Sequence, residues 1–197
     1  MQISGVIRNY RQVRDITFDW IDECTVIHKL ILSLCFAVLT GIMAQIRIYL
    51  PFTPVPITGQ VFAVLLTASI LGGYYGSLSQ IMYVGIGALG VSWFNGGIGG
   101  LSPLFGITGG YLIGFIPAAF VVGLLTKRFT ALRSFHFQLL LMMGGVAIIH
   151  LFGAIQIAMT LNIGVVGTIR LAILPFIALD LIKAVLAAGI STSILPK

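Results

Sequence analysis

The sequence predicts an all-α integral membrane protein built as a bundle of six transmembrane helices. The 197-residue chain is 58% hydrophobic and only 8% charged, with a mean hydropathy of +1.10. A water-soluble domain of this length needs more polar groups to cover its surface, so that class is excluded. No charged residue occurs between Arg47 and Lys127, a gap long enough for three membrane crossings.

Six apolar segments have the length needed to cross a bilayer, which is about 20 residues for a helix. Their approximate limits are 30–49, 57–72, 74–92, 107–126, 137–161 and 171–194. Helices are expected because lipid offers no partner for free backbone groups, and because the residue alternation of barrel strands is missing. Only Gly72 and Gly73 separate the second and third segments, so we expect a tight turn there.

The distribution of basic residues predicts that both termini are cytoplasmic and that the protein lies in the plasma membrane. Cytoplasmic loops are enriched in Lys and Arg. With six crossings, the side that holds both termini and the 126–136 loop carries Arg8, Arg11, Arg14, Lys29, Lys127, Arg128, Arg133 and Lys197. The other side has only Arg47 and Arg170. The net charge of +6 is therefore attributed to topology and to contact with anionic membrane lipids, and nucleic acid is not expected as a partner.

Two regions of the chain differ in character. Residues 1–28 are polar with charges of both signs, which predicts a cytoplasmic or interfacial N-terminal tail. No signal-peptide pattern is evident there, because the first apolar stretch comes late and lacks a small-residue cleavage site. Residues 29–197 are predicted to form the six-helix membrane domain.

Two segments on the outward side predict a covered pocket. Residues 47–57 read RIYLPFTPVPI, and their three prolines keep the backbone out of a helix. Residues 92–110 read SWFNGGIGGLSPLFGITGG and contain seven glycines. Both segments could be simple connectors. A long, uncharged loop with aromatic residues is more typical of a cap over a binding site.

Asp180 is the only acidic residue after Glu23, and it lies in the sixth apolar segment. A carboxylate in a spanning helix costs about 2.5–3.5 kcal/mol on insertion scales, so it needs a compensating role. Lys183, three residues later, shares its helical face and can neutralise it. A purely structural ion pair is one interpretation. A ligand site is favoured, because Asp180 is expected about two turns into the helix from the outer side, beneath the two loops.

Other residues expected near the outer side could complete a pocket. Asn95 and Gln60 each donate and accept hydrogen bonds, which suits a cyclic amide or urea. The further candidates are Thr58, Thr108, Phe52, Trp93, Phe94 and Tyr111. The histidines His28, His136 and His150 show no spacing for a metal or for catalysis, so interfacial or packed positions are expected. No P-loop, GxSxG or HExxH motif occurs, and no enzymatic activity is expected.

Small residues recur every four positions on the first predicted helix, at Ser33, Ala37 and Gly41. Such a stripe lets another helix approach closely. The partner helix could belong to the same chain or to a separate membrane subunit, and the spacing alone is compatible with both.

Three ordered motifs resemble the BioY family, the biotin-binding S components of energy-coupling factor (ECF) transporters. They are LPFTPVPITGQ at 50–60, the glycine-rich segment that ends in TGGY at Tyr111, and the D-x-x-K of Asp180 and Lys183. The resemblance spans about residues 30–190. It implies a six-helix membrane protein that binds biotin near the extracellular face as its transported ligand, with no cofactor. It also implies that a transmembrane coupling subunit, EcfT, and two ATPase subunits supply the energy. The stripe Ser33, Ala37 and Gly41 is similar to the docking motif of the family.

The resemblance suggests roles for the candidate residues. Asp180 would accept hydrogen bonds from the ureido N–H groups of biotin, with Asn95 or Gln60 serving the remaining polar atoms. Lys183 would either meet the ligand carboxylate or orient and neutralise Asp180. Trp93, Phe94 and Tyr111 would wall the ring. The alternatives are an S component for another small vitamin such as lipoate or thiamine, and a membrane scaffold subunit without a small-molecule ligand.

Overall fold

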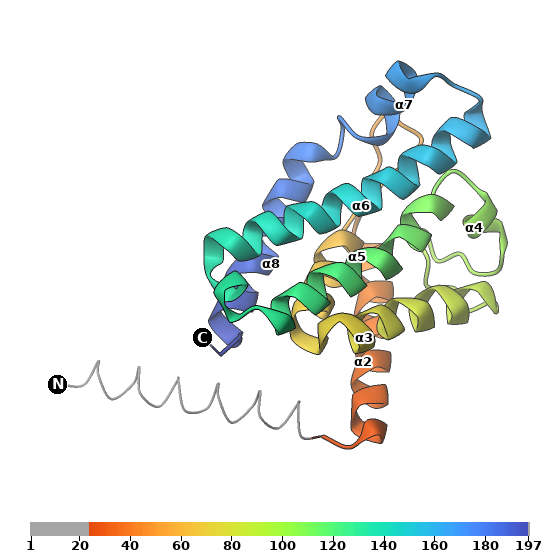
Figure 1. Cartoon of the computed structure of the whole chain (residues 1–197). Coiled ribbons are helices and arrows are strands. Elements are labelled where there is room, and N and C mark those ends of the chain that lie inside the picture. The colour runs from red at the N-terminus through yellow and green to blue at the C-terminus, as the bar shows by residue number, and fades with distance from the viewer. Residues whose placement is uncertain (1–23, 197) are drawn as a thin grey trace.

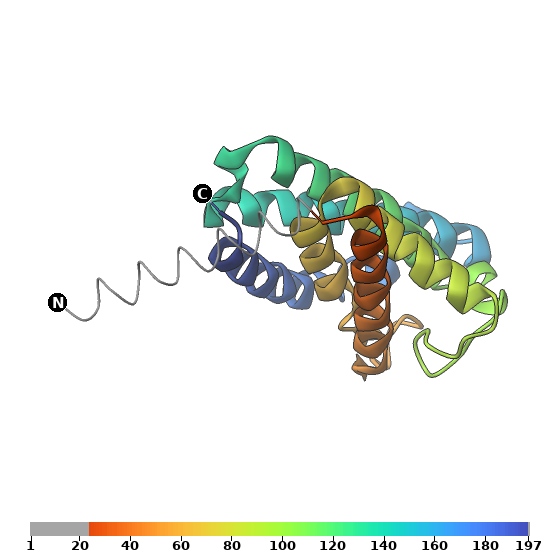
Figure 2. The same ribbon diagram turned by 90° about the horizontal axis from the view of Figure 1, so that it is seen from below.

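The computed structural model describes residues 24–196, which form a helical bundle with one short β-ribbon (Figures 1 and 2). Residues 1–23 of the predicted tail and Lys197 lie outside the described residues. In chain order the elements are α2 (Val26–Gln45), β1 (Arg47–Ile48), β2 (Ile57–Thr58), α3 (Gln60–Ala88), α4 (Ser102–Phe105), α5 (Gly109–Arg128), a 3₁₀ helix (Thr130–Arg133), α6 (Phe135–Leu161), α7 (Val165–Ala172) and α8 (Ile177–Ile194). The predicted all-helical class is confirmed.

Five helices of the described chain are long and apolar enough to cross a membrane: α2, α3, α5, α6 and α8. The second and third predicted segments both overlap α3, which is shorter at each end and folds back on itself at Gly72. This glycine has φ 79° and ψ −179°, outside the helical region. Gln60 Nε2 donates to Tyr83 Oη over 2.8 Å although the two residues are 23 positions apart. A straight helix would separate them by about 35 Å. The predicted turn is confirmed, while the count of six crossings stays a prediction.

Helix α5 packs across the tip of this α3 hairpin, and the contact depends on glycine. A Cβ atom on Gly123 of α5 would lie 2.4 Å from the carbonyl carbon of Gly72 and 2.6 Å from the oxygen of Ala68. Tyr74 and Phe120 stack edge to face beside this crossing. Helices α3 and α5 are accordingly central, with 61% of the most apolar stretch of each buried, against 22% for α2.

The sixth predicted segment, 171–194, is not one helix. Helix α7 ends at Ala172, and α8 begins only at Ile177. Pro175 explains the break, because it has no N–H group and disfavours helical geometry in the residue before it. Asp180 therefore lies in the first turn of α8, and the prediction that it lies about two turns into the helix is wrong. The break turns the start of α8 into a wall of the site described below.

The two predicted outward loops lie at the end of the bundle opposite the C-terminus, as does α7 (Figure 1). The proline-rich segment is closed by an antiparallel pairing of Arg47 with Thr58 and of Ile48 with Ile57. The glycine-rich segment contains α4 and turns at three residues with positive φ, namely Gly96, Gly97 and Gly100, while Gly90 turns the chain just before it. These turns bring the loop back over the start of α5.

Candidate ligand-binding site

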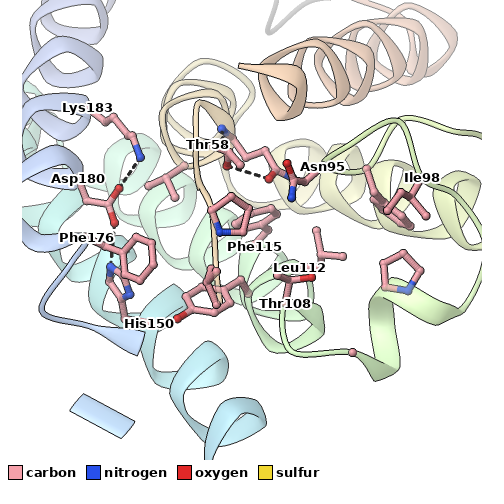
Figure 3. A pocket seen from close by; sticks show the side chains of 18 of the residues that line it. Thr58, Asn95, Ile98, Thr108, Leu112, Phe115, His150, Phe176, Asp180 and Lys183 are labelled. Atoms are coloured by element: carbon pink, nitrogen blue, oxygen red, sulfur yellow. Dashed lines mark hydrogen bonds and ion pairs between the residues drawn. The ribbon is translucent and has the colours of Figure 1, made fainter. Parts of the chain in front are cut away.

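A cavity of about 290 Å³ lies beneath the two loops, between the starts of α3, α5 and α8 and the middle of α6 (Figure 3). Its size falls near the lower end of the range for small-molecule pockets. The lining residues are Val55, Pro56, Thr58, Gln60, Val61, Phe94, Asn95, Ile98, Ser102, Pro103, Gly106, Thr108, Tyr111, Leu112, Phe115, His150, Phe176, Asp180 and Lys183. Most are apolar, and the polar side chains come from segments that are far apart in the sequence.

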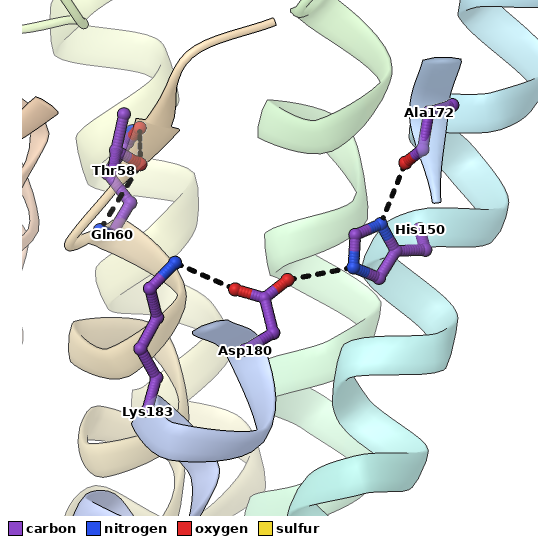
Figure 4. Close-up of polar contacts among 6 residues, drawn as sticks. All are labelled: Thr58, Gln60, His150, Ala172, Asp180 and Lys183. Atoms are coloured by element: carbon purple, nitrogen blue, oxygen red, sulfur yellow. Dashed lines mark hydrogen bonds and ion pairs between the residues drawn. The ribbon is translucent and has the colours of Figure 1, made fainter. Parts of the chain in front are cut away.

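Asp180 is held by a cation and a histidine, which together form a charged triad in the cavity wall (Figure 4). Lys183 Nζ lies 2.7 Å from Asp180 Oδ1, and His150 Nε2 lies 2.8 Å from Oδ2. The carboxylate is only 2% exposed. Because each oxygen has a protein partner, the carboxylate is fixed in orientation and its desolvation is offset. The predicted pairing of Asp180 with Lys183 is confirmed.

His150 is the member of the charged triad that the sequence did not indicate. It is buried, as a packed histidine should be, but it also lines the cavity and contacts Asp180, 30 positions away. Its Nδ1 lies 3.1 Å from the carbonyl oxygen of Ala172. The only available signal was a titratable side chain in the middle of the apolar segment 137–161.

Two of the three predicted aromatic wall residues do line the cavity. Tyr111 donates through Oη to the oxygen of Ala172 over 2.8 Å, and its ring meets His150 edge to face. Phe94 also faces the cavity. Trp93 does not line it, because its indole N–H donates to the backbone oxygen of Tyr83 and its ring packs on that tyrosine. Phe52, a further aromatic candidate, is 61% exposed and lies outside the lining.

The predicted polar residues of the outer half other than Tyr111 all line the cavity, namely Thr58, Gln60, Asn95 and Thr108. Thr58 donates to Gln60 Oε1 over 2.9 Å, and Gln60 Nε2 donates to Tyr83. The Gln60 amide is thus held by the protein. Asn95 Oδ1, by contrast, is buried and has no hydrogen-bond partner among the described residues. A buried amide oxygen without a partner is costly, so a ligand donor would relieve it.

The small-residue stripe on α2 contacts other parts of this chain. Ser33 Oγ donates to the backbone oxygen of Tyr75 over 3.1 Å, and Ala37 is fully buried. A Cβ atom on Gly41 would lie 3.2 Å from Cβ of Trp93. The internal-packing alternative is therefore realised. Docking of a separate subunit at these positions stays a prediction.

Comparison with known proteins places the chain in a family. The model of the BioY family matches residues 13–197. This chain belongs to the BioY family. It is 41% identical over 144 residues to the biotin transporter BioY of Thermotoga maritima, which covers 73% of this chain and 83% of that protein. It is 37% identical over 156 residues to the probable biotin transporter BioY of Pyrococcus horikoshii, with coverage of 79% and 89%.

The BioY fold also matches a solved structure. The crystal structure of the S-component for biotin from an ECF-type ABC transporter superposes with a TM-score of 0.79 at 27% identity, and the match covers 86% of this chain and 93% of that one. The fold predicted from the three motifs, an S-component-like membrane bundle, is confirmed. With five apolar helices of spanning length, this BioY-family chain is a multi-pass membrane protein.

Two glutamines hold the glycine-rich loop of this BioY-family protein over the cavity. Gln45 of α2 donates through Nε2 to the backbone oxygens of Trp93 and Phe94, both at 3.1 Å. Gln156 of α6 lies within 3.3 Å of the oxygens of Phe105 and Gly106. The loop is thus fixed near both ends, and Asn95 is presented to the cavity between these two attachments.

Proposed function

We propose that this chain is the high-affinity biotin-binding and uptake subunit of a vitamin transporter. The observation that carries the proposal is the cavity itself, in which the three family motifs meet although the first and the third lie over 100 residues apart along the chain. Thr58 and Gln60 come from the first motif, Tyr111 from the second, and Asp180 and Lys183 from the third. The relatives named as biotin transporters and the structural neighbour for biotin support the same ligand.

The groups on the cavity wall complement the parts of biotin. The ureido ring has two N–H donors and a carbonyl, and Asp180 keeps unused lone pairs on both oxygens to accept an N–H. The ammonium group of Lys183 keeps further N–H donors for a ligand oxygen. The Asn95 amide can serve as acceptor or donor for the remaining polar groups. Phe94, Tyr111 and other apolar lining residues suit the thiophane ring and the alkyl tail.

Within this proposal Lys183 orients and neutralises Asp180. The 2.7 Å contact between them supports this role over a separate grip on the far end of the ligand. A neutral ligand head with several N–H donors needs a strong acceptor in a site without water. The lysine offsets the desolvation cost of the carboxylate that serves as this acceptor in the apolar bundle.

Energy for uptake is proposed to come from partner subunits. The sequence has no P-loop, so ATP hydrolysis is assigned to two ATPases and its transmission to the membrane subunit EcfT. The structural neighbour belongs to an ECF-type ABC transporter, which supports this arrangement. The proposal also includes six crossings of the plasma membrane, with both termini in the cytoplasm and the cavity facing outward. The orientation is tested in intact cells that carry Lys197→Cys, with Cys24 and Cys35 replaced by Ser. These cells are treated with a thiol reagent that does not cross the membrane.

The deciding experiment is isothermal titration of the detergent-solubilised chain with biotin, followed by competition with lipoate and thiamine. We expect saturable one-to-one binding of biotin that neither competitor displaces at equal concentration. Preferential binding of lipoate or thiamine would assign another vitamin. No binding of any of the three would support a scaffold role and overturn the proposal.

A further inference from the structure

Both ring nitrogens of His150 face groups that accept hydrogen bonds. Nδ1 lies 3.1 Å from the backbone oxygen of Ala172, which can only accept, so Nδ1 carries a hydrogen. Nε2 lies 2.8 Å from Oδ2 of Asp180. A neutral imidazole protonated at Nδ1 would point its Nε2 lone pair at a carboxylate oxygen, which is repulsive. One proton must therefore lie between Nε2 and Oδ2, on the histidine or on the carboxyl group.

The position of this proton does not change the charge of the site. An imidazolium with a carboxylate and a neutral imidazole with a carboxylic acid both sum to zero, so the ammonium group of Lys183 leaves the triad with one positive charge. The described groups that contact His150 are Asp180 on α8, Phe176 just before it, Tyr111 on α5 and the Ala172 carbonyl on α7. Lys183 is linked to His150 only through Asp180. The Tyr111 hydroxyl donates to Ala172 and so retains its proton. The sequence has no other acidic residue after Glu23 to offset the charge.

We propose that His150 and Asp180 share one proton, and that the resulting single positive charge makes the cavity select a monoanionic ligand over its neutral analogue. The choice of biotin as the probe rests on the proposed function. His150 is here a positioning residue that acts through Asp180. At an effective dielectric constant of about 20, opposite charges about 8 Å apart attract enough to favour the anion by roughly tenfold or more, so the preference does not require direct contact between the ligand carboxylate and Lys183.

The test measures the ratio of the dissociation constant of biotinamide to that of biotin, at a pH where the biotin carboxylate is ionised. His150→Gln keeps an N–H donor for Asp180 but cannot supply the shared proton, so the site becomes neutral and the ratio should fall about tenfold. Asp180→Asn removes a negative charge together with the shared proton, so the net charge and the ratio should stay within about threefold of wild type. His136→Gln, on the exposed start of the same helix, is the matched control and should change nothing.

The outcomes separate the two proposals. An unchanged ratio in His150→Gln, or a tenfold rise in Asp180→Asn, overturns the shared proton, because both results would fit a neutral histidine beside an ionised carboxylate. If one variant does not fold, the other still decides. Failure of wild type to bind biotin overturns the proposed function alone.

A ligand-free measurement covers that last case. In ¹⁵N-histidine-labelled protein, with the His150 signals assigned by their loss in His150→Gln, Nε2 should resonate as a protonated or proton-sharing nitrogen. It should shift toward an acceptor nitrogen in Asp180→Asn. A free lone-pair signal for Nε2 in wild type would overturn the shared proton whether or not biotin binds.

Discussion

Lys183 Nζ contacts Asp180 Oδ1 at 2.7 Å, and the two residues lie three positions apart on the first turns of α8. His150 completes the arrangement from α6. The acidic group that the apolar chain retains is thus fully partnered before any ligand enters. Its orientation is therefore set in the empty protein, which lowers the entropic cost of binding a ligand there.

Asp180→Asn should weaken biotin binding by roughly ten- to hundredfold, because hydrogen bonds to a charged group contribute about 1.5–3 kcal/mol. Isothermal titration of the solubilised protein measures the change. Thr192→Ala, in the last turns of the same helix and bonded to the backbone oxygen of Ala188, is the control and should bind like wild type. Equal affinity in Asp180→Asn would mean that Asp180 and Lys183 form a structural pair only.

Asn95→Ala should lower biotin affinity without lowering thermal stability. The amide oxygen has no partner among the described residues, so its removal costs the empty protein no hydrogen bond. The bound state should lose a hydrogen bond worth about 0.5–1.5 kcal/mol, or roughly two- to tenfold in affinity. Titration and thermal unfolding are measured on the same sample. A lower melting temperature with normal affinity would instead assign Asn95 to the structure of the loop.

Gly153→Ala should damage the site through Tyr111. The new Cβ would lie 2.4 Å from atoms of the Tyr111 ring, so the ring must move and its bond to the Ala172 oxygen is expected to break. We expect at least about a tenfold loss of biotin affinity, since a small misplacement of a pocket wall costs more than 1 kcal/mol. Gly144→Ala on the same helix has open space around its Cβ and is the matched control. Similar affinities in the two variants would contradict this role of Gly153.

Gly72→Ala should destabilise the fold by about 1–3 kcal/mol, because its φ of 79° with extended ψ is a conformation that essentially only glycine adopts. The side chain of Lys127 also lies 2.5 Å from the position of the new Cβ. Gly85→Ala, within the second arm of α3 and with no atom near its Cβ, should be neutral or stabilising. Thermal unfolding in detergent compares the two. Equal melting temperatures would argue against a strained turn at Gly72.

Part of the site followed from local sequence. Asp180 and Lys183 share a face because they are three residues apart on a helix, and this holds whatever the helix packs against. Gly72 marked the turn of α3 because only a residue without a side chain takes that backbone conformation. The proline-rich and glycine-rich loops were recognisable because they cannot continue a helix.

Other features required the tertiary structure. Trp93 and Phe94 are neighbours in a loop, yet only Phe94 faces the cavity, because the indole N–H of Trp93 donates to the backbone oxygen of Tyr83. Asp180 lies in the first turn of α8 because the chain breaks near Pro175, whereas the apolar composition runs through the break without interruption.

Composition and local motifs were enough to predict the membrane environment, the helical class, the family and the residues that carry charge into the bundle. The composition of a segment decides whether it prefers lipid or water. The spacing of residues within a segment decides which of them share a helical face. The packing of the helices brought His150 to Asp180 and directed the stripe of α2 against its own chain, and the path of the loop left Asn95 Oδ1 without a hydrogen-bond partner among the described residues. Such pairings depend on how helices cross and on where loops fold back, and no pattern within a single segment encodes either.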